Sequence, residues 1–265
     1  MYTLVNATYV YNYDNAGNIT SKKTYVLTAE NATPSTLNST KSYTYGNTNW
    51  KDLLTAYNGV ALTYDTIGNP LSYYNGTSYT FNWEGRRLVS ATTGSNSLSF
   101  TYNDSGIRTS KTKNGVTTTY YLSGSQIIAE ETNGNFTVYI YDADGSILGF
   151  QYRGADYFQN TWDTYFFEKN LQGDVVAIYD ENYNKLVSYT YDAWGNFTRT
   201  YTNGGENTVA ANNPFTYRGY YYDYDLNFYY LNSRYYDPYV GRFINSDSLI
   251  AGNSGSIHGH NLFVY

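Results

Sequence analysis

The 265-residue sequence contains no cysteine, one methionine, two histidines and four prolines. Without cysteine the chain can form neither disulfide bonds nor thiolate metal sites. No run of about 18 apolar residues occurs, so no segment is typical of a membrane-spanning helix. The first residues lack the basic and apolar regions of a secretory signal peptide. Because the repeat pattern described below starts almost at once and the last residues are apolar, we expect a fragment of a longer protein.

Charged side chains are also scarce, at 14% of residues, and they sum to a net charge of −6. An acidic chain is poorly suited to nucleic acid, whose binding requires a basic surface that displaces counterions. The glycine-rich motifs of nucleotide-binding folds and the serine elbow of hydrolases are missing from the sequence. His258 and His260 lie close together, but no third metal ligand follows Asp247. We therefore expect no cofactor, no metal and no nucleic-acid partner.

Aromatic residues, by contrast, make up 20% of the chain and include 36 tyrosines. Tyrosine supplies apolar area for a core while its hydroxyl remains able to form hydrogen bonds. Many of these residues recur in one short pattern: aromatic, any residue, aromatic, Asp or Asn, two residues of any kind, and glycine. With small variations the pattern occupies residues 11–18, 62–69, 79–86, 100–106, 139–145 and 189–196.

Each copy of this pattern predicts a β-hairpin. Aromatic residues two positions apart lie on one face of a strand, and the Asp or Asn accepts hydrogen bonds from turn amides. The repeat carboxylates are therefore interpreted as turn caps rather than as catalytic groups or calcium ligands: Asp14, Asp65, Asp142 and Asp192. Glycine then closes the turn with positive φ, which we expect at Gly17, Gly68, Gly106, Gly145 and Gly195. Stacked hairpins predict an all-β fold, a spiralling antiparallel sheet with less than about a tenth helix.

The most distinctive segment runs from Tyr217 to Asp247 and reads YRGYYYDYDLNFYYLNSRYYDPYVGRFINSD. It resembles the core segment of RHS-repeat (YD-repeat) proteins, whose pattern contains Y-R-G-Y-Y-Y-D, L-Y-Y-L-x-S-R-Y-Y-D-P and G-R-F-I. Two positions depart from that pattern. Asn227 stands where the family has glycine, although Asn tolerates the left-handed backbone region, and Ser248 follows Asp247 where the family has proline. The resemblance implies an RHS/YD β-shell with hairpin repeats over 1–201, an exposed loop over 202–213 and a core segment, truncated at its C-terminus, over 214–265.

In this family the sheet forms a hollow shell. The resemblance therefore implies a structural fragment of a bacterial polymorphic toxin, secreted or on the cell surface, that encapsulates its own C-terminal toxin domain. It also implies an aspartyl self-protease in the core, since two nearby carboxylates can share a proton. The residues that match are Asp247, Asp237, Arg234 and Arg242, and the same four fit an ion-pair network that plugs the shell equally well. Because the chain ends at Tyr265, before the family's cleavage site, we do not expect the fragment itself to be an active enzyme.

Two other functions remain open from the residues alone. Exposed aromatic rings stack on sugars, so the chain also fits a carbohydrate-binding, adhesive cell-surface module. The four tryptophans fit sheet packing as well, although a place inside a turn motif favours exposure of Trp83 and Trp194; the set is Trp50, Trp83, Trp162 and Trp194. The second alternative is a carboxylate hydrolase such as a glycosidase, which needs two carboxylates about 5–10 Å apart in an open cleft.

Overall fold

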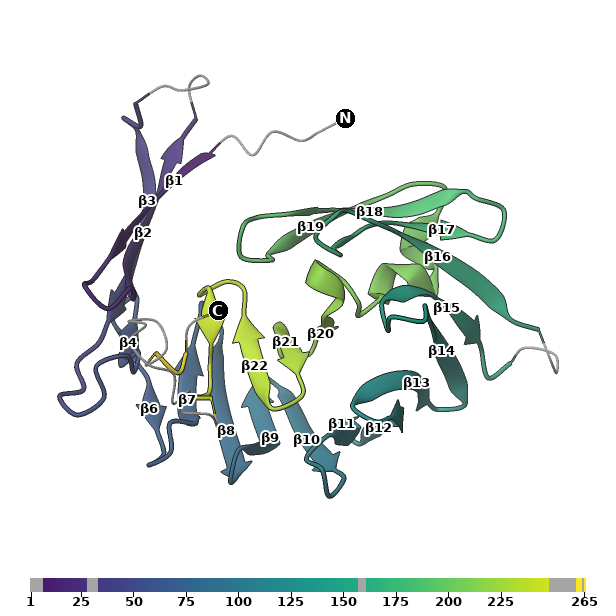
Figure 1. The fold of residues 1–265 in the computed structure, drawn as a ribbon, viewed down its shortest axis with the longest axis horizontal. Helices are drawn as coiled ribbons and strands as arrows, with labels where there is room; N and C mark the ends of the chain where they lie inside the picture. The colour runs from purple at the N-terminus through teal and green to yellow at the C-terminus, as the bar shows by residue number, and fades with distance from the viewer. Residues whose placement is uncertain (1–6, 28–32, 157–160, 248–260, 264) are drawn as a thin grey trace. The chain divides into compact units, whose positions relative to one another are not determined.

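The computed structural model describes the chain except for residues 1–6, 28–32, 157–160, 248–260 and 264. The described residues fold almost entirely as antiparallel β-strands (Figure 1), which confirms the predicted all-β fold. They contain no α-helix. Three short 3-10 helices occur, at Gly205–Asn207, Val209–Asn212 and Tyr217–Gly219. None of the described helices has the length and hydrophobicity needed to cross a membrane.

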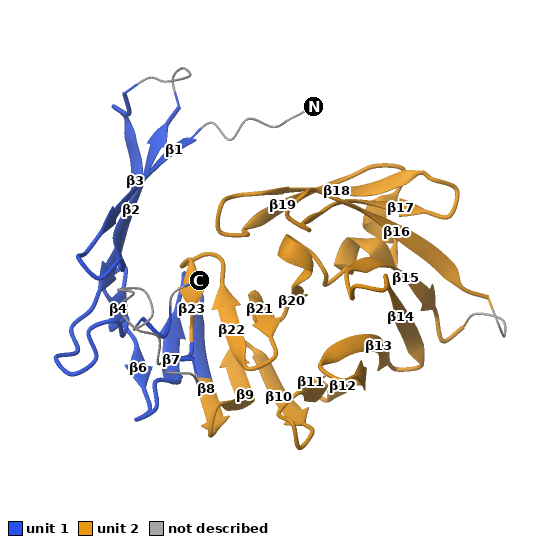
Figure 2. Cartoon of the chain, in the orientation of Figure 1, with its two compact units in different colours: residues 1–80, 245–265 blue, residues 81–244 orange. Residues whose placement is uncertain are grey.

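The chain divides into two compact units, shown in Figure 2. The first unit comprises residues 1–80 and 245–265, and the second comprises residues 81–244. The three-part division expected from the sequence remains a prediction. The first unit contains a five-stranded sheet in chain order: β1 (Ala7–Tyr13), β2 (Ile19–Val26), β3 (Leu37–Thr44), β4 (Ala56–Tyr57) and β5 (Val60–Ala61). Strands β6 (Thr63–Tyr64) and β7 (Pro70–Tyr74) follow, and β8 (Ser78–Glu84) contains the boundary between the units.

The second unit is a long meander in which each strand lies beside its neighbour in the chain. Its strands are β9 (Arg87–Thr93), β10 (Asn96–Tyr102), β11 (Arg108–Lys113), β12 (Val116–Ser123), β13 (Gln126–Thr132), β14 (Asn135–Tyr141), β15 (Ile147–Arg153), β16 (Asp163–Lys169), β17 (Val175–Asp180), β18 (Lys185–Tyr191) and β19 (Phe197–Tyr201). A separate four-stranded sheet comprises β20 (Tyr221–Asp223), β21 (Phe228–Leu231), β22 (Arg234–Asp237) and β23 (Arg242–Phe243). Within this unit the long sheet curves around the small one (Figure 1). Residues 214–244 are the part of the predicted core segment that belongs to this unit.

The turns of the repeat have the geometry that the pattern predicts. In the first copy, Oδ1 of Asp14 accepts hydrogen bonds from the amides of Ala16 and Asn18, both at 2.9 Å. Asp65, Asp142 and Asp192 accept the equivalent pairs of amides. The predicted glycines all have positive φ, with values of 82°, 85°, 77°, 80° and 86° at Gly17, Gly68, Gly106, Gly145 and Gly195. The interpretation of these carboxylates as turn caps is thereby confirmed.

The aromatic residues of the repeat have two different uses. The first residue of most copies is buried and forms the core, as at Tyr139 and Tyr189, although Tyr11 is only half-buried. The second tyrosine turns its hydroxyl back to a neighbouring strand. Tyr102 donates to the carbonyl of Leu88 at 2.8 Å, and Tyr141 donates to that of Ile127 at 2.7 Å. Tyrosine therefore satisfies a backbone acceptor between strands while its ring contributes apolar area.

The segment 202–213, which the sequence predicts as an exposed loop, differs from that expectation. It contains two of the 3-10 helices, and Ala210 and Ala211 are buried. Arg199 of the neighbouring strand β19 donates a hydrogen bond to the carbonyl of Ala211. The two small apolar side chains pack closely against the sheet, so only part of the segment is exposed.

Candidate functional site

Two of the predicted site residues lie opposite each other in the small sheet. Asp237 ends strand β22 and is fully buried, and Arg242 is its partner residue in strand β23. Oδ1 of Asp237 accepts hydrogen bonds from the amides of Tyr239 at 2.7 Å and Val240 at 3.2 Å. Its backbone carbonyl accepts a third from Gly241 at 2.8 Å. Asp237 therefore caps the turn 238–241 that joins the two strands.

The other two predicted residues have different surroundings. The guanidinium of Arg234 lies 3.6 Å from the centre of the Phe243 ring, a cation–π contact. Asp247 belongs to the other compact unit, where its amide donates to the carbonyl of Leu262 at 3.0 Å. A catalytic role for these four residues stays a prediction. His258 and His260 lie outside the described residues, among which no cluster of metal-ligating side chains occurs.

The core segment is attached to the repeat turn that Asp192 caps. Three successive carbonyls of this turn accept hydrogen bonds from core tyrosines: Ala193 from Tyr217 at 3.2 Å, Trp194 from Tyr236 at 2.9 Å and Gly195 from Tyr229 at 2.8 Å. The rings that carry these hydroxyls are themselves packed against one another, with Tyr229 in contact with both Tyr217 and Tyr236. A turn that would otherwise face solvent is therefore held by the core.

The turn that Asp237 caps also contacts this repeat turn. The side-chain amide of Asn196 donates to the carbonyl of Pro238 at 2.7 Å. Gly241 lies against Trp194 so closely that a β-carbon at this position would be 3.0 Å from the indole ring. Gly241 also has a φ of 77°, a backbone conformation that glycine adopts readily. The cap at Asp237 therefore shapes the surface that receives Trp194.

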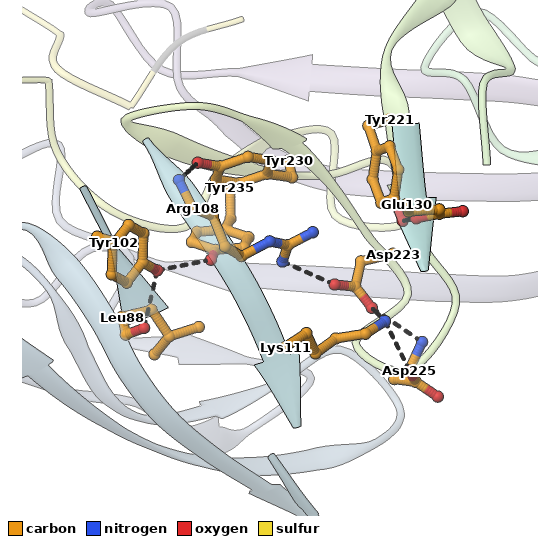
Figure 3. Close-up of polar contacts among 10 residues, drawn as sticks. All are labelled: Leu88, Tyr102, Arg108, Lys111, Glu130, Tyr221, Asp223, Asp225, Tyr230 and Tyr235. Atoms are coloured by element: carbon orange, nitrogen blue, oxygen red, sulfur yellow. Dashed lines mark hydrogen bonds and ion pairs between the residues drawn. The ribbon is translucent and has the colours of Figure 1, made fainter. Parts of the chain in front are cut away.

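A second attachment, which the sequence did not predict, consists of buried ion pairs between strand β11 and the start of the core hairpin (Figure 3). Nη1 of Arg108 lies 2.8 Å from Oδ2 of Asp223, and both side chains are fully buried. Lys111 bridges Asp223 at 3.0 Å and Asp225 at 2.7 Å. Lys113 adds a further pair with Asp225 at 2.7 Å. We call these five residues the buried ion-pair cluster.

The electrostatics of this cluster favour the charged forms. Burial by itself raises the pKa of Asp223, but Lys111 and Arg108 outweigh that effect and lower the pKa to about 2. The Arg108 guanidinium is enclosed by four rings, at 4.3 Å from Tyr230, 4.9 Å from Tyr120, and 5.4 and 5.6 Å from Phe100 and Tyr221. Its Nε and Nη2 have no hydrogen-bond partner among the described residues. Cation–π attraction thus replaces part of the lost hydration.

The cluster fastens the core hairpin rather than offering a reactive group. The carboxylate of Asp223 is committed to two cations, and the backbone carbonyl of Asp223 accepts hydrogen bonds from the amides of Leu226 and Asn227 in its own turn. Asn227 has the predicted left-handed conformation, with φ of 59°. Beside it, the Tyr230 hydroxyl accepts a hydrogen bond from the amide of Arg108 at 2.9 Å. Charge pairs and backbone contacts therefore fix the position of the β20–β21 hairpin against strand β11.

One sequence signal could have revealed this cluster. Arg108 stands two residues after the repeat glycine Gly106, at a position that is apolar in most other copies, although the copy at 79–86 has Arg87 there. The equivalent residues Ile19, Ile147 and Val175 are buried. A charged residue in such a position indicates a buried partner of opposite charge, because an unpaired buried charge is costly. Which carboxylate it pairs with does not follow from the local sequence.

The tryptophans are packed within their units. Trp83 contacts Tyr235 and Phe81 in the second unit, and Trp50 contacts Phe263 in the first. Trp83 and Trp194 are half-buried, so their places in turn motifs give less exposure than expected. Carbohydrate binding through these rings stays a prediction.

No protein-family model matches the chain. Among curated proteins it is 31% identical to the tRNA3(Ser)-specific nuclease WapA of Bacillus spizizenii and 30% identical to the tRNA nuclease WapA of Bacillus subtilis (strain 168). Both alignments cover 96% of this chain but 10% of the relative. The chain therefore spans about a tenth of the length of these relatives.

Solved structures show the same fold. The crystal structure of TcdB2-TccC3-Cdc42 has a TM-score of 0.69 at 19% identity, covering 97% of this chain and 13% of that one. The crystal structure of TcdB2-TccC3-TEV has a TM-score of 0.64, also at 19% identity and with the same coverage. Along nearly its whole length, this chain is similar in sequence to part of the WapA nucleases and shares the fold of part of these TcdB2-TccC3 structures.

Proposed function

We propose that this chain is a segment of an RHS-repeat shell, in which the sheet forms the wall of a container and residues 214–265 form the core that closes it around a C-terminal effector. The observation that carries this proposal is the attachment of the core segment to a repeat turn by Tyr217, Tyr229 and Tyr236. A container needs a wall and a closure that is fastened to the wall. The buried ion-pair cluster supplies a second fastening.

The effector itself is assigned to sequence outside this chain. The relatives are named as tRNA nucleases, and the chain corresponds to about a tenth of their length. A net charge of −6 favours a wall rather than a surface for nucleic acid. The similarity to these nucleases supports a toxin-related role for the whole protein, which we place outside the bacterial cell or on its surface.

Within this proposal the core also performs the self-cleavage that the RHS resemblance implies. Asp247 acts as the main catalytic carboxylate, and Asp237 either shares its proton or serves only as a turn cap. Burial and a facing arginine are compatible with either role for Asp237. Substitution by asparagine separates the two roles, because Asn retains an oxygen acceptor for the turn amides but cannot exchange a proton.

The test uses the chain extended at its C-terminus through the family's Asp-Pro-x-Gly cleavage segment and an effector domain. We expect the extended protein to cut itself, and the effector to resist an added protease while it is enclosed. Asp247→Asn should abolish the cut without unfolding the sheet. Asp142→Asn, a change at a distant turn cap, is the matched control. Mass spectrometry reports the cut.

Three outcomes of this test would contradict the proposal in part or whole. If the extended wild-type protein stays intact, or if the Asp247→Asn variant cuts normally, the proposed self-protease activity is contradicted. If the added protease digests the effector in the extended protein as fast as it digests the free effector domain, the proposed enclosure is contradicted. Loss of cutting in Asp237→Asn with an unchanged unfolding transition assigns Asp237 to the reaction, and unchanged cutting assigns it to the turn.

A further inference from the structure

Two adjoining cavities lie between the long sheet of the second unit and the segment 207–214. Each has a volume of about 360 Å³, and Asn135, Tyr152 and Val209 line both. Glu130 lies in the wall of the first cavity, and Asp156 and Asp163 line the second. No lysine or arginine is among the described residues that line either one. We call the two cavities together the acidic groove.

Glu130 is held in place at one end of this groove. Its Oε1 accepts a hydrogen bond from the Tyr139 hydroxyl at 2.5 Å, and its Oε2 accepts one from Tyr221 at 2.9 Å. Figure 3 shows the Glu130 carboxylate beside Tyr221, which belongs to core strand β20. Two phenols orient this carboxylate, and none of the ion pairs found among the described residues includes it.

The other end of the groove is acidic too. Burial, Asp163 and Asp156 together raise the pKa of Tyr152, which lines both cavities. At the Glu130 end, burial and that carboxylate raise the pKa of Tyr139 well above its ordinary value. A phenol resists ionisation where the local potential is negative. Carboxylates line both ends, and no lysine or arginine is among the described lining residues, so both ends attract positive charge. The ring of Tyr152 offers a surface that suits a cation.

We propose that the acidic groove binds a cationic polypeptide segment, with lysine or arginine side chains directed to Glu130 at one end and to Asp156 and Asp163 at the other. This inference rests on the proposed function, because it assigns the segment to the enclosed effector. The groove lies on the face of the sheet that carries the core strands, since Glu130 itself contacts Tyr221. Aliphatic stems of Lys or Arg pack along aromatic walls while their charged ends reach carboxylates.

The experiment uses the 265-residue chain and the peptide acetyl-Gly-Lys-Gly-Lys-Gly-amide, with binding followed by titration calorimetry at low salt. The same peptide with both lysines acetylated is the uncharged probe, and cellotetraose is the neutral sugar probe. We expect the lysine peptide to bind about tenfold or more tightly than its acetylated form, and binding to weaken as salt is raised. Cellotetraose should not bind.

The variants are Glu130→Gln and Asp156→Asn, with Glu181→Gln at an exposed turn outside the groove as the matched control. Each groove variant should lower the affinity for the lysine peptide by about fivefold or more, and the control variant should leave that affinity unchanged. Asp156 is exposed, so its substitution tests the charge even if Glu130→Gln alters the fold. Circular dichroism checks each variant.

The inference is overturned if the lysine peptide does not bind, if the acetylated peptide binds equally well, or if both groove variants bind like the parent chain. Binding of cellotetraose in place of the peptide would identify a carbohydrate site and would also overturn it. These results are independent of the shell. If the effector in the extended protein resists protease but the groove does not bind the lysine peptide, only the proposal for the groove is rejected.

Discussion

The hydroxyl of Tyr229 lies 2.8 Å from the carbonyl oxygen of Gly195, across 34 residues of sequence. This contact joins the two patterns visible in the sequence, because Gly195 closes a repeat turn and Tyr229 belongs to the core segment. Both groups are buried, so neither can exchange its partner for water without loss. The contact thus defines where the core segment meets the wall.

Removal of that hydroxyl should weaken the attachment. We expect Tyr229→Phe to lower the free energy of unfolding by about 1–2 kcal/mol, because the buried carbonyl of Gly195 loses its donor. Tyr183→Phe is the control, since Tyr183 is 80% exposed. Urea unfolding measures both variants. Equal stability of Tyr229→Phe and the parent would show that the hydrogen bond contributes nothing to docking.

Adding a β-carbon at Gly195 should lower the free energy of unfolding by more than adding one at another glycine with the same backbone conformation. Gly195 and Gly115 have φ of 86° and 87°, so alanine is strained at both by about 1 kcal/mol. At Gly195 the new atom would also lie 2.6 Å from the Tyr217 ring, whereas at Gly115 nothing lies within 4 Å. Gly195→Ala should therefore be less stable than Gly115→Ala by a further 1–3 kcal/mol, roughly. Thermal unfolding compares them, and equal losses would contradict the close packing.

The buried ion-pair cluster should respond asymmetrically to the loss of its members. Arg108→Met leaves Asp223 with Lys111 as a partner, and methionine resembles the apolar residues at this position in other repeats. Asp223→Asn leaves the guanidinium of Arg108 buried without a carboxylate, at a cost of about 3–5 kcal/mol. We expect Asp223→Asn to be the more destabilising change in urea unfolding. The reverse order would mean that Lys111, rather than Arg108, governs the cluster.

The stabilisation that the buried ion-pair cluster provides should decrease at low pH, within a defined range. The pKa of Asp223 is lowered from 3.8 to about 2 in the folded chain, so the unfolded chain binds its proton first as pH falls. The stabilisation is complete above about pH 4 and is lost between about pH 4 and 2, and it amounts to about 2 kcal/mol. Unfolding free energies measured across this range should fall less steeply in Asp223→Asn than in the parent. Identical slopes would show that Asp223 titrates normally in the fold.

The local features of this structure could be predicted because a few neighbouring residues determine them. The glycine and the aspartate of each repeat form a turn within five residues, so positive φ at Gly195 and capping by Asp192 follow from the sequence. The partner of Arg108 lies 115 residues away, and nothing in either hairpin specifies it. Burial of Ala210 and Ala211 within the segment 202–213 likewise depends on contacts outside that segment, with strands β18 and β19.

The strand order of the second unit has a consequence for how it folds. From β9 to β19 every strand pairs with the strand before it in the chain, so each hairpin can join a growing edge as soon as its own residues are available. Pairing between chain neighbours closes only short loops, which makes such assembly fast. The core contacts, by contrast, join residues far apart in the chain, such as Tyr102 and Tyr235, whose hydroxyls are in contact across 133 residues of sequence. We therefore expect the wall to assemble progressively from its N-terminal strands during synthesis, and the core to lock into it as the final step.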